Sequence, residues 1–274
     1  MSTPRLAPRT ALFLPASNPR AIAKARGLHA DMVILDLEDA VRDDAKAAAR
    51  VAAVAAAGEG FGHRLCAIRL NAIDSGEHDA DLAAVAASAC DFVVLPKVEA
   101  AVDAARVAQA CGKPLLAMIE TPRGVLAAAA IAAVPGVAGL IAGVNDLRAT
   151  LGIPANAGRE GLALALQAIV LAARAGGGWA IDGVFNALDR PDALAEECRQ
   201  GRAMGFDGKS LIHPGQIEAA AAAFGPTAEE IADAYALIDA AIGGAERFRD
   251  RMIEAMHLDQ ARSLLARMDS RNVE

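Results

Sequence analysis

Short apolar runs, many of them rich in β-branched residues, recur along the chain. They are TALFLP (10–15), DMVILDL (31–37), LCAIRLN (65–71), DFVVLPK (91–97), PLLAMIE (114–120), AGLIAGV (138–144), WAIDGVF (179–185) and FDGKSLI (206–212). Ala-rich stretches with helical periodicity lie between several of them, at 79–89, 99–111, 158–176 and 192–204. Strands that alternate with helices pair in parallel. Eight such units in 274 residues predict an α/β fold, a (β/α)8 TIM barrel. A doubly wound open sheet is the alternative, but no G-x-G-x-x-G follows the first run.

The chain continues well beyond the eighth run. We expect the barrel to span residues 1–225 and a C-terminal helical extension to span 226–274, with helices at 229–241 and near 257–268 and a Gly243-Gly244 pair between them. Apolar residues recur in the last segment at helical spacing and need a surface to cover; they are Met256, Leu264, Leu265 and Met268. The extension is therefore expected to cover the barrel mouth or a neighbouring subunit.

Composition narrows the class of protein. Hydrophobic residues make up 54% of the chain, so a sizeable core is possible, and the formal net charge is −7 with no basic block, which argues against nucleic acid as a partner. An acidic protein that binds an anionic substrate needs a local metal or local arginines. The stretch from Gly124 to Asn145 carries no charge, but Pro135-Gly136 interrupts it, so we expect no membrane span.

The four cysteines form no CxxC pair. We therefore expect reduced thiols in a cytoplasmic protein. The first apolar run is too short for the core of a signal peptide.

Polar side chains follow the apolar runs where each predicted strand ends. In barrels of this kind the chemistry lies at the carboxyl ends of the strands. These positions hold Asp36, Glu38, Asp39, Arg69, Asn71, Lys97, Glu99, Glu120, Asn145, Asp146, Asp182, Asn186 and His213. They predict a ring of polar groups at one mouth of the barrel.

Glu120 and Asp146 end the fifth and sixth predicted strands and should be neighbours. Two carboxylates that face one site repel each other unless a cation neutralises them. Mg²⁺ accepts one or two protein carboxylates and takes its other oxygens from water and substrate. The alternative is structural: Glu120 caps a helix or pairs with Arg123.

Several neighbouring residues have a functional and a structural interpretation. Arg69 could bind a carboxylate or a developing oxyanion through its planar fork, or form a salt bridge to Glu38 or Glu120. Asp36 and Glu38 point to the same face by strand alternation, and one of them could orient a water or act as a base.

The remaining strand-end residues carry weaker signals. For Asp39, we favour a helix cap or an ion pair with Lys46. Lys97 could be a Schiff-base lysine, but the nearby acids favour an ordinary charged amine. His213 could be a general base or a packing residue.

Successive motifs along nearly the whole chain resemble the citrate lyase beta-subunit-like proteins of the HpcH/HpaI aldolase superfamily. The motifs are RTALFLPASNPRAIAKA, DMVILDLEDAV, IRLN, VVLPKVE, MIETPRGV, IAGVNDLRATLG, AIDGVF, MGFDGKSLIHPGQI and FGPTAEEIADA. The resemblance implies a (β/α)8 barrel, Mg²⁺ as cofactor and a homotrimer. It also implies an enzyme that cleaves or forms C–C bonds in short acyl-CoA or acyl-carrier thioesters, although some members are malyl-CoA thioesterases.

The resemblance also assigns roles to residues of this sequence. Glu120 and Asp146 match the metal ligands, Arg69 matches the substrate-binding arginine, and Glu38 matches an acid near the metal's waters. Asn145, beside Asp146, is expected to bind substrate. Many relatives carry a catalytic Asp in a C-terminal lid that reaches a neighbouring subunit, and Glu254 stands at that position here.

The functional expectation is an Mg²⁺-dependent carbon–carbon lyase. It would cleave or form a 3-hydroxyacyl-CoA thioester such as malyl-CoA or citryl-CoA, with an acyl-CoA and a 2-oxo acid as the other partners in the reaction. A thioesterase with the same metal site is the first alternative. The second is the beta subunit of a multi-subunit citrate lyase complex.

Overall fold

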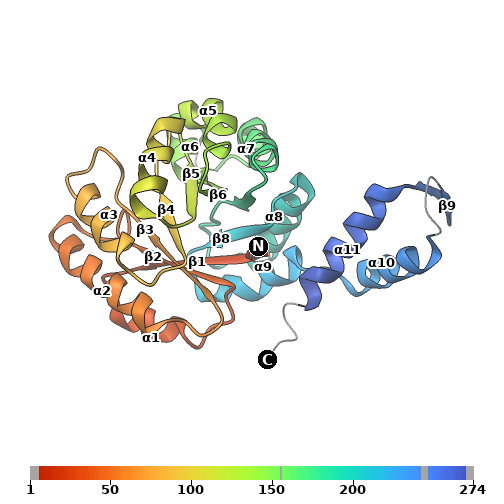
Figure 1. Ribbon diagram of the computed structural model, residues 1–274, viewed down its shortest axis with the longest axis horizontal. Helices are drawn as coiled ribbons and strands as arrows, with labels where there is room; N and C mark the ends of the chain where they lie inside the picture. The colour runs from red at the N-terminus through yellow and green to blue at the C-terminus, as the bar shows by residue number, and fades with distance from the viewer. Residues whose placement is uncertain (1–5, 155, 242–245, 270–274) are drawn as a thin grey trace. The chain divides into compact units, whose positions relative to one another are not determined.

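The computed structural model describes residues 6–154, 156–241 and 246–269. Eight parallel strands close into a barrel in the order of the sequence, and helices surround them (Figure 1). The strands are β1 (Thr10–Pro15), β2 (Met32–Asp36), β3 (Leu65–Arg69), β4 (Phe92–Leu95), β5 (Leu115–Ile119), β6 (Val137–Ala142), β7 (Trp179–Asp182) and β8 (Gly208–Leu211). Closure comes from β1, which pairs in parallel with β8 as well as β2. The predicted TIM barrel is therefore confirmed.

The helices that follow the strands agree with the periodicity where it is clear. They are α1 (Pro19–Ala25), α2 (Lys46–Glu59), α3 (His78–Ala86), α4 (Ala101–Cys111), α5 (Pro122–Ala132), α6 (Val144–Thr150), α7 (Ala163–Ala175), α8 (Pro191–Met204) and α9 (Ile217–Phe224), with short 3-10 turns at Asp43–Ala45, Glu160–Leu162 and Pro214–Gln216. The short helix α6 was not expected. Because of it, Asn145 and Asp146 lie in the first turn of a helix rather than at the end of β6.

Apolar side chains from the strands fill the barrel interior. Met32, Ile34, Val94, Leu116 and Ile141 belong to one buried cluster there. The rings of Phe92 and Trp179 also meet inside it, with centroids 5.1 Å apart. The interior is therefore a packed core. Most buried polar side chains of the strands lie at strand ends, and Lys209 and Ser210 are the exceptions, since both are buried within β8.

The junction of β5 and α5 shows how the sequence directs a carboxylate to the mouth. β5 is buried along its whole length, and α5 begins with Pro122 at its first turn. Thr121 caps this helix: its side-chain oxygen accepts a hydrogen bond of 3.0 Å from the N–H of Gly124. Glu120 is thus held between the end of a buried strand and a capped helix.

The C-terminal part of the chain forms its own compact unit, which begins at Ala222, whereas the barrel unit is Ala7–Ala221. Its elements are α10 (Ala228–Ala240), β9 (Glu246–Phe248), β10 (Arg251–Ile253) and α11 (Ala255–Asp269). The two helices were expected and the β9–β10 hairpin was not.

Apolar side chains hold this C-terminal unit together. Ala234, Leu237, Ile253 and Ala261 form its core, and Leu264 and Leu265 pack against them. Met256 is exposed, and the side chain of Met268 and the Gly243-Gly244 pair lie outside the described residues. Part of the predicted apolar face therefore covers its own unit.

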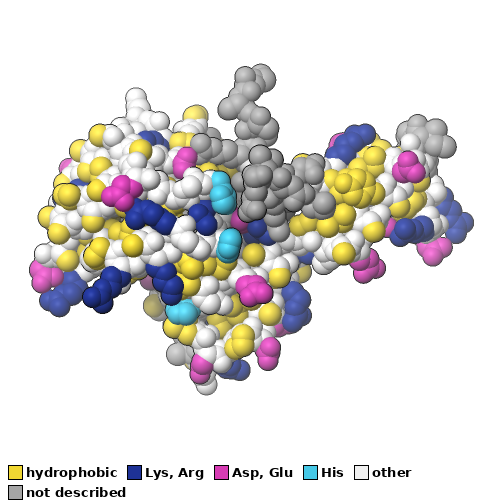
Figure 2. Space-filling model, turned by 90° about the horizontal axis from the view of Figure 1, so that it is seen from below, with side chains coloured by type: hydrophobic (Ala, Val, Ile, Leu, Met, Phe, Trp, Pro, Cys, Tyr) yellow, Lys and Arg dark blue, Asp and Glu magenta, His cyan; other side chains and the backbone are white. Residues whose placement is uncertain are grey.

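The surface carries charge of both signs. On the face shown in Figure 2, basic and acidic side chains are interspersed with apolar ones. None of the helices in the described ranges is long and apolar enough to cross a membrane.

Candidate active site

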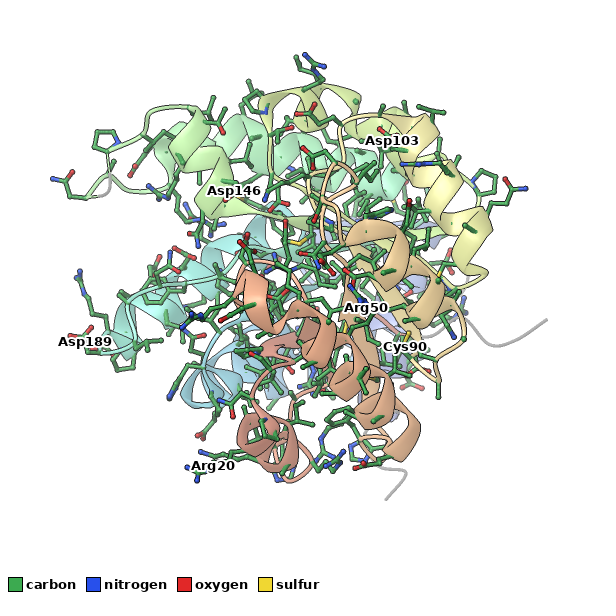
Figure 3. The ribbon with its side chains drawn as sticks, turned by 90° about the vertical axis from the view of Figure 1, so that its left-hand side faces the viewer. Arg20, Arg50, Cys90, Asp103, Asp146 and Asp189 are labelled. Carbon is green, nitrogen blue, oxygen red and sulfur yellow. The ribbon has the colours of Figure 1, made fainter. Side chains whose placement is uncertain are left out.

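A cavity of about 340 Å³ opens at the carboxyl ends of the barrel strands. Its lining includes Phe13, Asp36, Asp39, Arg69, Met118, Glu120, Asn145, Asp146 and Ser210. The structure thus brings together residues from the ends of β1, β2, β3, β5 and β8 and from α6, where Figure 3 labels Asp146.

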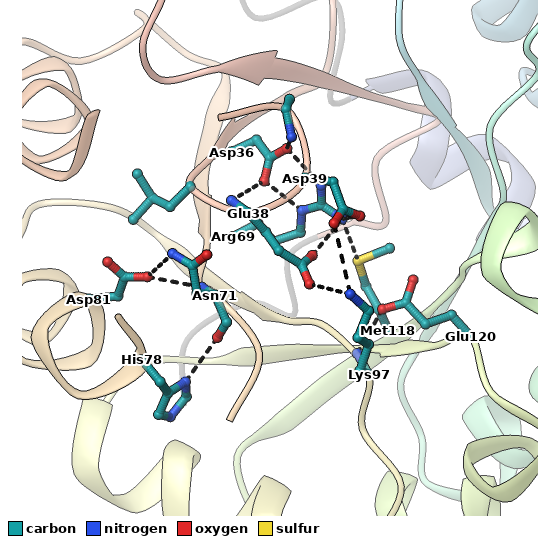
Figure 4. Close-up of polar contacts among 12 residues, drawn as sticks. Asp36, Glu38, Asp39, Arg69, Asn71, His78, Asp81, Lys97, Met118 and Glu120 are labelled. Atoms are coloured by element: carbon teal, nitrogen blue, oxygen red, sulfur yellow. Dashed lines mark hydrogen bonds and ion pairs between the residues drawn. The ribbon is translucent and has the colours of Figure 1, made fainter. Parts of the chain in front are cut away.

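Asp36 holds Arg69 in place at the base of this cavity. The Nε and Nη2 groups of Arg69 each donate a hydrogen bond of 2.6 Å to the Asp36 carboxylate (Figure 4). Asp36 also accepts bonds from the backbone N–H groups of Glu38 and Ala40, at 2.9 and 3.1 Å. Four N–H groups thus donate to the Asp36 carboxylate. Asp36 therefore anchors Arg69 and the loop after β2 and is not a free base.

Arg69 therefore has one nitrogen to offer the cavity. Its bidentate edge is occupied by Asp36, and Nη1 lies 3.0 Å from Glu38 Oε2 and 3.8 Å from the sulfur of Met118. Its guanidinium also stacks over Phe13, 5.0 Å from the ring centroid. Burial alone lowers the pKa of Arg69, but the hydrogen bonds and charge of Asp36 outweigh burial and raise it. The salt-bridge interpretation is correct for Glu38, and any substrate contact is left to Nη1.

Glu38 lies buried between two cations. Its Oε1 accepts a hydrogen bond of 2.9 Å from Lys97 Nζ, and its Oε2 pairs with Arg69 without a hydrogen bond. Burial raises its pKa, although the charges of Arg69 and Lys97 oppose that rise. Lys97 is thus an ordinary charged amine that is paired with an acid.

The expected ion pair between Asp39 and Lys46 is wrong. Lys46 Nζ instead donates to the carbonyls of Leu37 and Glu38 and to Asn71 Oδ1, which saturates it. Asp39 lines the cavity with a side chain that is 60% exposed, 3.8 Å from both Arg69 and Lys97. Of the acids Asp36, Glu38 and Asp39, it is the one without a short ion pair.

Glu120 is 3% exposed, and two backbone features make room for it and hold it. The N–H of Lys97 donates a hydrogen bond of 2.7 Å to its Oε1. Gly143 permits the close approach, since a Cβ at that position would overlap the Glu120 side chain and its Oε2. Arg123, the alternative partner, lies 3.7 Å from Glu99 instead.

The electrostatics of Glu120 favour a cation beside it. Burial raises its pKa to about 7; the Lys97 N–H opposes this shift, and the charges of Glu38 and Asp146 add to it. No group of three or more His, Cys, Asp and Glu side chains within the described ranges is arranged to hold a metal ion. Glu120 and Asp146 nevertheless line one cavity as a pair of carboxylates, which fits Mg²⁺ with water or substrate at its other positions.

Other predicted residues lie at the edge of the cavity or outside it. The amides of Asn145 and Asn186 exchange hydrogen bonds of 2.7 and 3.4 Å. His213 caps a turn, its Nδ1 accepting from the N–H of Gly215 at 3.0 Å. Asp182 forms a buried cluster with Arg159 and Lys209.

Glu254 belongs to the C-terminal unit, where it is exposed and directly precedes α11. Its N–H donates to Nδ1 of His257 at 3.0 Å. The barrel cavity and Glu254 therefore belong to two different compact units.

Sequence reasoning missed the structural roles of Phe13, Gly143 and the Lys97 amide. One signal was available: glycine directly after a buried strand often marks a close approach of the backbone. A backbone donor such as the Lys97 N–H has no residue-type signal.

Known proteins resemble this chain over nearly its whole length. Residues 9–214 match the family model described as HpcH/HpaI aldolase/citrate lyase. The chain is 42% identical over 271 residues to a (3S)-malyl-CoA thioesterase of Cereibacter sphaeroides, covering 96% of this chain and 95% of that protein. It is 37% identical to a citrate lyase subunit beta-like protein of Deinococcus radiodurans, covering 97% and 99% of the two chains.

Solved structures also resemble this chain in fold. The fold is similar to that of CitE from Mycobacterium tuberculosis in complex with magnesium, acetoacetate and coenzyme A. The TM-score is 0.83 and the identity 35%, covering 97% of this chain and all of that one. It is also similar to a citrate lyase beta subunit from M. tuberculosis complexed with oxaloacetate and magnesium. There the TM-score is 0.72 and the identity 37%, covering 80% of this chain and 98% of that one.

Proposed function

Because the chain belongs to the HpcH/HpaI aldolase/citrate lyase family, we propose that it is an Mg²⁺-dependent carbon–carbon lyase. Its substrate is a short 3-hydroxyacyl-CoA thioester such as malyl-CoA or citryl-CoA, and its products are an acyl-CoA and a 2-oxo acid. The observation that carries this proposal is the buried carboxylate of Glu120, which shares a cavity with Asp146 and Arg69. The solved relatives with magnesium, coenzyme A and small oxo acids support it.

Glu120 and Asp146 would hold the metal. The chemistry supplied by a bound Mg²⁺ is Lewis-acid polarisation of the substrate's oxygens. When the 3-hydroxyl group loses its proton, a carbonyl forms at C3 and the C2–C3 bond breaks. The bonding electrons pass to C2, which becomes a thioester enolate and then takes up a proton to give the acyl-CoA.

The remaining side chains stabilise charge and move protons in this scheme. Arg69 Nη1 stabilises the negative charge that develops in the cavity, and Asp36 keeps it there. Asp39 accepts the hydroxyl proton, since it lines the cavity and its nearest cations are 3.8 Å away. Glu38 pairs with both Arg69 Nη1 and Lys97 Nζ and so links these two cations, and Asn145 binds a polar group of the substrate.

Hydrolysis of the thioester is the second candidate. The 42% identity to proteins named (3S)-malyl-CoA thioesterase favours it. In that case water attacks the thioester carbonyl, free CoA leaves, and the C2–C3 bond stays intact. The same metal site serves both reactions, so the products distinguish them.

A thioester panel with Mg²⁺ tests the proposal. Malyl-CoA, methylmalyl-CoA and citryl-CoA are incubated with the protein and scored for acyl-CoA, free CoA and 2-oxo acid. A lyase yields equal amounts of acyl-CoA and 2-oxo acid, whereas a thioesterase yields free CoA and no 2-oxo acid. Glu120→Gln, which keeps the shape but removes the charge, serves as the inactive control. Turnover that is the same with and without Mg²⁺ would refute the metal-dependent mechanism.

We also propose a homotrimer in which the C-terminal unit acts as a lid. In this arrangement Glu254, on the segment before α11, reaches the cavity of a neighbouring subunit and acts as an acid or base there. The exposed side chains of Met252 and Met256, on either side of Glu254, support a contact surface in this segment.

A further inference from the structure

Lys97 has a backbone conformation that side chains other than glycine rarely adopt. Its φ is 52°, in the left-handed region. The other non-glycine residue with positive φ in the described ranges is Arg249, which lies in the turn between β9 and β10. Lys97 follows β4 and Pro96 at the barrel mouth, where no hairpin requires such a turn. Strain of this kind persists only where the surroundings enforce it.

The residues around Lys97 do enforce it. The N–H of Val98 donates a hydrogen bond of 3.3 Å to the carbonyl of Met118 in β5. The carbonyl of Val98 packs against α5 at Gly124, where an added Cβ would lie 2.5 Å from that oxygen. Pro96 restricts the chain on the other side. The loop is therefore clamped to β5 and α5, and the clamp turns the N–H of Lys97 toward Glu120.

The two ends of Lys97 then hold two different acids. Its backbone N–H donates a hydrogen bond of 2.7 Å to Oε1 of Glu120 and not to Oε2. Its Nζ donates to Glu38 Oε1 at 2.9 Å and lies 3.8 Å from Asp39. Glycine would adopt this backbone without strain but would leave Glu38 with Arg69 alone.

We propose that Lys97 is a positioning residue whose left-handed backbone fixes Glu120 and whose ammonium group fixes Glu38, so that one residue sets the geometry of both acids. The inference rests on the proposed function, because it takes Glu120 as a ligand of Mg²⁺. Lys97 is not among the residues that line the cavity, and its hydrogen bonds go to these two acids.

Two substitutions that both remove the ammonium group isolate the backbone contribution. Lys97→Gly keeps the N–H and favours positive φ, whereas Lys97→Val keeps the N–H but disfavours positive φ because valine is β-branched. We expect the valine variant to bind Mg²⁺ about tenfold more weakly than the glycine variant in calorimetric titrations. Equal affinities would overturn the backbone role. Should Lys97→Val fail to fold, Lys97→Ala replaces it, with an expected difference of about fivefold.

A second pair of substitutions isolates the ammonium group. Lys97→Arg and Lys97→Gly both keep the N–H, but only arginine can still pair with Glu38. We expect Lys97→Gly to retain its Mg²⁺ affinity and lose about tenfold in kcat with little change in KM, and Lys97→Arg to recover most of that loss. Glu38 should also move from its present position in a crystal structure of Lys97→Gly. An unmoved Glu38, or full turnover in Lys97→Gly, would overturn this half.

The failure of this inference is distinguishable from the failure of the proposed function. Mg²⁺ titration of the unsubstituted protein needs no thioester. An absence of Mg²⁺ binding there refutes the proposed function and the inference together. Binding that is equal in Lys97→Gly and Lys97→Val refutes the inference alone.

Discussion

At the scale of single residues, Glu120 shows what a sequence reveals about a site and what it does not. A carboxylate directly after a buried apolar run predicts a functional acid at the barrel mouth, and its pairing with Asp146 follows from strand order. The partners that shape the site are a backbone N–H from Lys97 and the missing side chain of Gly143. Asp36 and Arg69 were both identified, but their pairing depends on side-chain rotamers that no sequence pattern reports.

The raised pKa of Glu120 predicts how metal binding depends on pH. With a pKa of about 7, Glu120 in the metal-free protein holds a proton below neutral pH, and Mg²⁺ must displace it. Mg²⁺ affinity should therefore rise by up to about tenfold per pH unit below pH 7 and level off above it. Calorimetric titration from pH 6 to 8 measures this, and a flat profile would contradict the assignment.

The same shift predicts how the stability of the metal-free protein depends on pH. The pKa of Glu120 in the folded protein is about 7, against 4.5 for an ordinary glutamate. Between these values the folded state holds a proton that the unfolded state has lost, so the free energy of unfolding falls as pH rises. The fall attributable to this group is at most about 3 kcal/mol. Glu120→Gln should lack this component in denaturant titrations, and Mg²⁺ should offset it in the unsubstituted protein.

At the scale of elements, the strands were predictable and the shortest elements were not. Eight buried runs of apolar residues identify β1 to β8 because parallel strands are apolar on both faces. Helix α6 has seven residues, too few for its periodicity to stand out, and β9 and β10 have three each. Asn145 and Asp146 were expected at the end of a strand and lie in helix α6 instead, but both residues are at the barrel mouth.

The contact between β5 and the start of α6 predicts the effect of a single methyl group. Gly143→Ala would place a Cβ against Glu120, so Glu120 must shift. We expect a stability loss of about 1–3 kcal/mol and clearly weaker Mg²⁺ binding. Gly58→Ala in α2 is the matched control, since nothing lies within 4 Å of the added Cβ. It should be neutral or slightly stabilising. Unfolding curves and Mg²⁺ titrations of the two variants make the comparison, and equal behaviour would contradict the packing argument.

At the scale of the whole molecule, the barrel was predictable because eight similar units repeat, whereas the role of the C-terminal unit was not. Leu264 and Leu265 pack within that unit, so their apolar character does not require a neighbouring chain. The proposed lid depends on Glu254 and on the exposed methionines around it. The role of Glu254 must therefore be tested in oligomers that combine two different variant chains.

Mixing two full-length variants tests the lid. Arg69→Ala chains have a defective cavity and an intact lid, and Glu254→Ala chains have the reverse. If Glu254 acts on a neighbour in a ring, about a quarter of the sites in a random equal mixture combine an intact cavity with an intact lid. Activity should return accordingly, with mixed oligomers verified by native mass spectrometry. Mixed oligomers without recovery would contradict action between subunits.

The pairing of Asp36 with Arg69 also restricts how the Arg69 side chain can move. Each oxygen of Asp36 accepts two hydrogen bonds, one from the Arg69 guanidinium and one from the backbone. The Arg69 side chain is therefore held as rigidly as the strand it extends from, and its Nε proton should exchange slowly with solvent. The rotamer entropy of an arginine, about 2 kcal/mol, is therefore lost when the chain folds rather than each time a ligand arrives. Association at Arg69 should accordingly carry little entropic penalty from the protein, and the nuclear spin relaxation of this guanidinium should be nearly the same before and after a ligand binds.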